Sequence, residues 1–89
     1  MQDIDFKWWW LSYANDHGFL GVVILTAPTF IDACKISASL KLSPGGEVIG
    51  WELTNESKHK INLSSILKLL NKKEALELVV SLDEIPHKL

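Results

Sequence analysis

The chain has 89 residues, of which 47 % are hydrophobic and 22 % are charged, and its formal net charge is −2. This length supports one domain with one small core, and it excludes an enzyme built around a cleft between two domains. The apolar content and four tryptophans exclude intrinsic disorder. We therefore expect a single domain over residues 1–89, with a mixed unit over residues 1–57 and a helical segment over residues 58–89.

All nine basic residues are lysine, and the chain has one cysteine. Without arginine the chain has no guanidinium group to donate bidentate hydrogen bonds to guanine or phosphate, so we do not expect nucleic acid as a partner. A single cysteine excludes an internal disulfide and suits a reducing compartment. The most apolar run, residues 19–27, is too short to span a bilayer, and the acidic residues Asp3 and Asp5 are unlike a secretory signal. We expect a cytoplasmic protein with no membrane partner.

Two apolar runs, residues 6–14 and residues 19–27, predict β-strands. The residues between them, 15–18, are typical of a turn. The short link predicts an antiparallel hairpin in which Gly18 adopts a positive φ.

Both predicted strands are apolar on both faces. Because side chains alternate along a strand, Trp8 and Trp10 lie on one face and Trp9 lies on the other. The second strand likewise places Val22 and Val23 on opposite faces. Strands of this kind need cover on both sides of the sheet.

A helix is predicted from Pro28 to Leu42, because proline at the first helical position loses no hydrogen bond. Its apolar side chains occupy about two-thirds of the circumference, more than the stripe of an ordinary surface helix. We therefore expect a second cover over this helix, from the C-terminal segment or from another subunit. The sequence Pro44-Gly45-Gly46 predicts a tight turn after it.

A third strand is predicted over residues 47–54, which alternate with Ile49, Trp51 and Leu53 on one face. A polar loop is predicted over residues 55–60, between this strand and the next apolar run.

Two C-terminal helices complete the prediction. The first covers residues 61–70, and the second begins at Asn71, where the spacing to Glu74 is that of a capping box. Residues 76–82 also alternate as a strand would, so a strand is the alternative there. The predicted fold class is α+β, with a small three-stranded sheet in the order β-β-α-β, one packed helix and two C-terminal helices.

We expect no enzymatic activity, no metal and no cofactor. Cys34 lies on the apolar face of its predicted helix, which is typical of a packed thiol. His17, His59 and His87 lie in separate segments without the spacing of metal ligands. No serine has the setting of a nucleophile.

The tryptophan run is the most unusual feature, because a small core hardly accommodates all four indoles. It predicts packing in the core and at a subunit interface, or an aromatic surface that stacks on a ligand or partner. The glycine turn can expose backbone amides to a ligand, with a lysine close by. The candidate ligand or partner contacts are Trp8, Trp9, Trp10, His17, Lys41, Gly45, Gly46 and Trp51.

Several short motifs resemble a group of small uncharacterised proteins of bacteriophage and prophage genomes. The motifs are Gly18-Phe19-Leu20-Gly21, Ala27-Pro28, Pro44-Gly45-Gly46-Glu47-Val48 with Gly50, and Leu69-Leu70 before the Asn71 to Glu74 cap. The resemblance implies a β-β-α-β unit with a helical C-terminal segment, and a location in the host-cell cytoplasm. It supplies no catalytic residues, and the tryptophan run is not part of it.

The residues predict a non-enzymatic, homo-oligomeric binding protein, and the resemblance implies that it is of phage type. It would sequester a small nucleotide-like ligand or counter a host defence protein. The alternative is a protein–protein inhibitor that is anchored by its tryptophan-rich strand or adds a strand to a partner's sheet edge. Homo-oligomers are expected because the two-faced strands and the broad apolar helix would otherwise leave large exposed patches.

Overall fold

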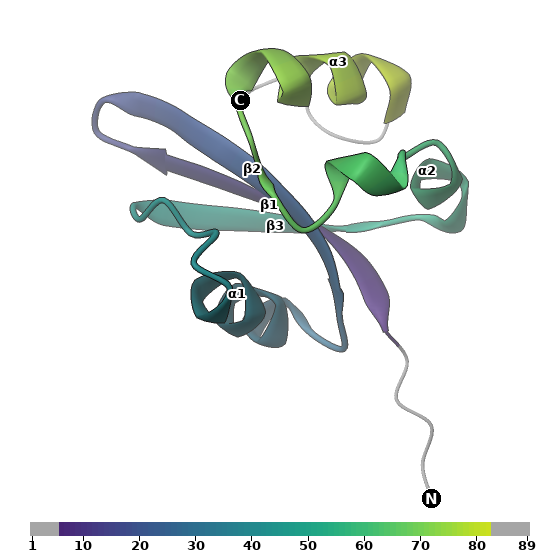
Figure 1. Ribbon diagram of the computed structural model, residues 1–89, viewed down its shortest axis with the longest axis horizontal. Helices are drawn as coiled ribbons and strands as arrows, with labels where there is room; N and C mark the ends of the chain where they lie inside the picture. Colours follow the sequence, from purple (N-terminus) through teal and green to yellow (C-terminus); the bar gives the residue numbers. More distant parts are fainter. Residues whose placement is uncertain (1–5, 83–89) are drawn as a thin grey trace, which may run out of the picture.

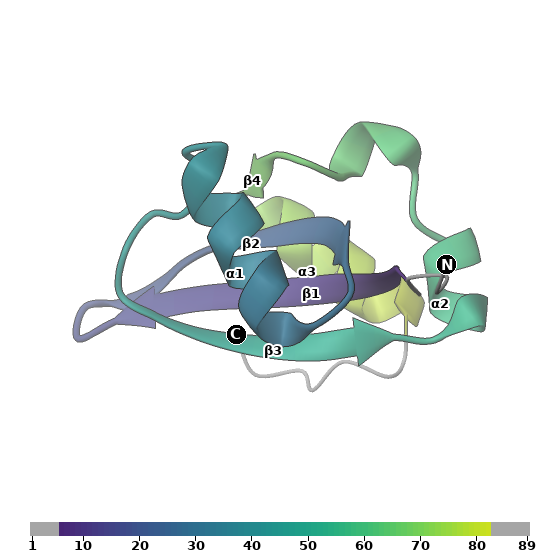
Figure 2. The same cartoon turned by 90° about the horizontal axis from the view of Figure 1, so that it is seen from below.

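The computed structural model describes residues 6–82, and it shows a four-stranded antiparallel sheet with helices on both faces (Figures 1 and 2). The elements in chain order are β1 (Lys7–Asn15), β2 (Gly18–Ala27), α1 (Phe30–Ser39), β3 (Glu47–Leu53), α2 (Asn55–His59), a 3-10 helix (Leu63–Ser65), β4 (Leu69–Leu70) and α3 (Lys72–Leu82). The strand order is β3-β1-β2-β4, so β3 and β4 form the two edges of the sheet.

The hairpin of β1 and β2 confirms the predicted pair of strands. Trp10 lies opposite Ile24 in its antiparallel register. At the turn, the backbone N–H of His17 donates a hydrogen bond to Oδ1 of Asn15 over 2.8 Å, and Gly18 has a φ of 116°. An asparagine that bonds the backbone two residues on, followed by a glycine with positive φ, closes such a turn without strain.

The sheet has a hydrophobic core on each face, as the two-faced strands predict. Trp10, Ile24 and Val79 of α3 are buried together on one face. Leu11 and Ala33 of α1 are buried together on the other face. Figure 1 shows α1 on one side of the sheet and α2 and α3 on the opposite side. The C-terminal segment therefore covers the sheet face opposite α1, and the expectation that it covers α1 itself is wrong.

The helix α1 begins later and ends earlier than predicted. Thr29 is its N-cap, and its Oγ1 accepts a hydrogen bond from the backbone N–H of Asp32 over 3.1 Å. Threonine is a strong N-cap because its side chain supplies an acceptor that proline lacks, so Pro28 precedes the cap instead of opening the helix. The helix ends at Ser39, and Lys41 follows with a φ of 60°.

The predicted helix over residues 61–70 is wrong, and so is the predicted loop over residues 55–60. Residues 55–59 form the short helix α2, and part of the 61–70 segment adds the fourth strand that the prediction lacked. The backbone N–H of Leu67 donates to the carbonyl oxygen of Ile24 over 2.9 Å, and Leu70 lies opposite Val22. The segment thus bonds to the free side of β2, because a central strand's polar groups need partners that a local helix would not supply.

The capping box of α3 is confirmed. Oδ1 of Asn71 accepts a hydrogen bond from the N–H of Glu74 over 2.9 Å, and the N–H of Asn71 donates to Oε1 of Glu74 over 3.1 Å. The helix continues to Leu82, so helix and not strand is correct for residues 76–82. The remainder of the predicted 58–89 segment, after Leu82, lies outside the described residues.

One buried polar contact joins α1 to the sheet. The hydroxyl groups of Tyr13 on β1 and Ser37 on α1 lie 2.8 Å apart, and both residues are buried. A buried hydroxyl that loses its partner carries the full cost of leaving water.

We predict that Tyr13→Phe lowers the free energy of unfolding by about 1–3 kcal/mol, because it leaves the Ser37 hydroxyl buried without this partner. Adding Ser37→Ala removes that second hydroxyl and restores most of the loss. Urea unfolding of the two single variants and the double variant measures the coupling. Additive losses in the double variant would contradict a direct bond between the two hydroxyls.

Candidate functional site

The tryptophans lie mainly in the cores. Trp10 is 0 % exposed and lies directly opposite Trp51 across the β1–β3 pair. Trp8 and Trp51 are half-buried and pack on the same core as Trp10. Trp9 packs on the opposite core, where its Nε1–H donates to the carbonyl oxygen of Ala27 over 3.0 Å. The predicted alternation of the three indoles along the strand is therefore confirmed.

The tryptophan-rich strand is not available to pair with another protein. The strand β1 is hydrogen-bonded to β2 on one side and to β3 on the other. Trp9 is further held by Phe30, with 6.0 Å between ring centroids and 56° between ring planes. Buried Trp10 has no hydrogen-bond acceptor for its Nε1–H among the described residues. Of the four indoles, Trp51 is the one carried by an edge strand.

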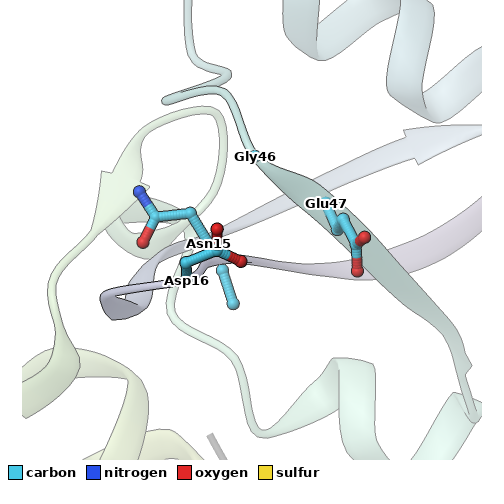
Figure 3. Close-up of a pocket in the computed structure, with 5 residues that line it drawn as sticks. Asn15, Asp16, Gly46 and Glu47 are labelled. Atoms are coloured by element: carbon cyan, nitrogen blue, oxygen red, sulfur yellow. The ribbon is translucent and has the colours of Figure 1, made fainter.

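The glycine turn borders a shallow hollow at one end of the sheet. A Cβ on Gly46 would overlap the backbone oxygen of Ala14, so only glycine allows this close approach to β1. Figure 3 shows the hollow between the end of β1 and the start of β3. Its volume is about 290 Å³, and its lining residues are Ala14, Asn15, Asp16, Gly46 and Glu47.

The chemistry of this hollow is acidic. Two of its five lining residues are acids, and none is a lysine. Lys41 and His17, which the sequence grouped with the glycines, are exposed but do not line it, and the tryptophans lie away from it. The structure therefore brings Gly46 to a hollow without the basic group that was expected there. Two carboxylates repel a phosphate, so the hollow does not favour a nucleotide.

The feature that sequence reasoning missed is the outer border of β3. The sequence places Ile49 on the same face of its strand as Trp51 and Leu53, and in the structure Leu53 is buried while Ile49 is 62 % exposed. Ile49 lies opposite Ser12 of β1, and the main contacts of α3 with the sheet are to β2 and β4. The alternation placed Ile49 on the correct face, but no sequence signal shows that this part of the face lies beyond the helices.

The border of β3 combines backbone groups and apolar side chains. The strand has seven residues and pairs with β1 on one side only. In Figure 2, β3 runs along the border of the sheet, and no described element lies beyond it. Glu52 is partly neutralised by Lys7, whose Nζ lies 3.5 Å from its Oε1. We call β3, with the exposed Ile49 and the half-buried Trp51, the β3 border.

The described residues offer little for catalysis. Burial raises the pKa of the Cys34 thiol, and a thiol that stays protonated is a poor nucleophile. Within residues 6–82, no group of histidine, cysteine or acidic side chains could hold a metal ion. In the same part of the chain, no helix is long and apolar enough to cross a membrane.

No family model, curated protein or solved structure matches the chain.

The two turn glycines provide a matched pair of substitutions. Gly45→Ala places a side chain at a φ of 91° with no heavy atom within 4 Å, which costs about 1–2 kcal/mol of backbone strain. Gly46→Ala adds a collision with the backbone of Ala14 to a similar strain. We predict that Gly46→Ala lowers the free energy of unfolding clearly more than Gly45→Ala does in urea titrations. Equal losses would show that β1 does not approach the turn this closely.

Proposed function

We propose that this protein is a non-enzymatic binding module that contacts a protein partner through the β3 border. The observation that carries the proposal is a seven-residue strand at the edge of the sheet, unpaired on its outer side among the described residues. Such an edge presents a row of backbone donors and acceptors to which another strand can bond.

The sequence of β3 supports this proposal, because the centre of the strand lacks the usual protection of an edge strand. Natural edge strands are protected by proline, by charged side chains (lysine above all), by a bulge or by a covering segment. The strand contains neither proline nor lysine, and its two charged residues, Glu47 and Glu52, leave the centre, Ile49 to Trp51, without charge. An exposed isoleucine next to a half-buried tryptophan supplies apolar contact area beside the backbone bonds.

A protein partner suits the geometry better than a small anionic ligand. The described hollow is open and acidic, and the three indoles on β1 are buried or half-buried instead of forming a stacking platform. Sequestration of a nucleotide-like ligand and the phage setting stay predictions of the sequence. The proposal keeps a tryptophan as part of the contact with a protein partner. The tryptophan is Trp51 on β3, in place of the three tryptophans on β1.

The absence of enzymatic activity is part of the proposal. Cys34 belongs to α1 and is half-buried against the core on that face, whereas His17 and His59 lie in the hairpin turn and in α2. Acid–base or nucleophilic catalysis needs such groups within hydrogen-bonding reach of each other. The described residues show no hydrogen bond between them, which supports a binding role.

Site-specific photo-cross-linking tests the proposal. A benzophenone amino acid placed at position 49 should form a protein adduct in cells that make the chain, because this position lies at the centre of the β3 border. The matched control is position 31, since Ile31 on α1 is 64 % exposed and Ile49 is 62 % exposed. We expect an adduct from position 49 and none from position 31. No adduct from position 49, or equal adducts from both positions, would refute the β3 border as the contact surface.

A further inference from the structure

We propose that the partner at the β3 border is a second copy of this chain, bound by antiparallel pairing of the two β3 strands around a two-fold axis at Gly50. The inference rests on the proposed function, because it names the partner for the same border. Pairing of this kind joins the two sheets of four strands into one continuous sheet.

Symmetry restricts the registers in which two β3 strands can pair. Antiparallel ladders alternate between hydrogen-bonded and non-hydrogen-bonded residue pairs. A two-fold axis makes the pair i with j equivalent to the pair j with i. If residue i lay opposite residue i+1, the symmetry-related pair would be the next pair along the ladder. The two neighbouring pairs would then be of the same type, which the alternation forbids. The numbers of two opposed residues must therefore add up to an even number.

This rule removes the charge conflict that would otherwise oppose self-pairing. Like charges directly opposite each other destabilise a pair of strands. Glu47 and Glu52 carry one odd and one even number, so they never face each other in a symmetric register. When the axis passes at Ile49, Gly50 or Trp51, neither acid faces its own copy. The two acids are thus compatible with pairing to a second copy. Because they are exposed, they repel acidic residues of other strands.

Among these registers, the one centred on Gly50 uses the whole strand. The strand spans Glu47–Leu53, so Gly50 is its middle residue, and full overlap satisfies the backbone along the entire outer edge. In this register Ile49 of each copy lies opposite Trp51 of the other. A β-branched side chain beside an aromatic ring is among the favourable cross-strand pairs. The two residues that leave apolar surface on the border thereby cover each other.

The surroundings of Gly50 allow the two strands to face each other at this residue. On the α1 face of the sheet, the ring of Phe30 occupies the place that a Cβ at Gly50 would take. Two glycines facing each other at the axis bring no side chains into conflict. In the view of Figure 2, α1 extends over the sheet as far as β3, and the described chain leaves the outer side of this strand open.

The native mass of the purified protein tests this inference. Light scattering after size exclusion, at the highest soluble concentration, should give twice the 10.0 kDa of one chain. The variant Ile49→Lys places a charge opposite Trp51 of the second copy, so we expect the mass of one chain. The control Ile31→Lys makes the same change at an equally exposed position on α1 and should keep the doubled mass. Circular dichroism should show that both variants fold.

Each outcome bears on the inference. A single-chain mass for the unaltered protein, or a doubled mass that survives Ile49→Lys, would overturn self-pairing through β3. If the unaltered protein has the mass of one chain while position 49 forms adducts with a different protein in cells, the proposed function stands and the second copy is the wrong partner. If position 49 forms no adduct at all, the proposed function fails as well.

Discussion

The arrangement of this protein depends on one constraint, which is that its central strands are apolar on both faces. Trp9 and Trp10 are neighbours on β1 and point to opposite sides of the sheet, where each packs into a separate core. Leaving either face open would expose indole and aliphatic surface to water, so both faces need helices. The chain meets this need by placing α1 on one face and α3 on the other, as Figure 1 shows.

This use of the helices determines which parts of the sheet stay accessible. With α1 and α3 committed to the faces, the edges are covered by short segments or are left open. The outer side of β2 receives the two residues of β4 and a hydrogen bond from Leu67. The outer side of β3 receives no described segment, although this strand has seven residues. The chain itself hides the apolar faces of its central strands, while large apolar side chains such as Ile31, Leu63 and Val80 stay exposed on its outer elements. The β3 border differs from these positions because its exposed Ile49 lies beside unpaired backbone groups.

Local patterns predict those features that local interactions decide. The hairpin turn at Gly18, the alternation of Trp8, Trp9 and Trp10 and the Asn71 capping box are each set by neighbours in the sequence, and all three are confirmed. The segment before α3 could not be predicted in this way. Its conformation includes a hydrogen bond from the N–H of Leu67 to the carbonyl oxygen of Ile24, and no pattern within the segment encodes a partner so distant in the sequence.

In the candidate site, too, some features follow from the local sequence and others from the whole fold. Trp51 and Gly46 are among the contact residues predicted from the sequence, and the structure places Trp51 on an edge strand and Gly46 beside a hollow. Sequence reasoning missed Ile49, because alternation assigns a side chain to a face of a sheet but does not tell how far the covering helix extends over that face. The order of the strands, with β3 at the border, is likewise a property of the whole fold.

The central claim is that the sheet is closed on its two faces and completed along β3 by another strand. Amide hydrogen exchange, measured residue by residue in the unaltered protein, tests it most directly. In an unpaired edge strand, alternate N–H groups point outward and exchange fast, while the others are bonded to β1. We predict slow exchange for consecutive residues throughout β3, with the alternation appearing in Ile49→Lys. Alternating fast exchange along β3 in the unaltered protein would contradict the account.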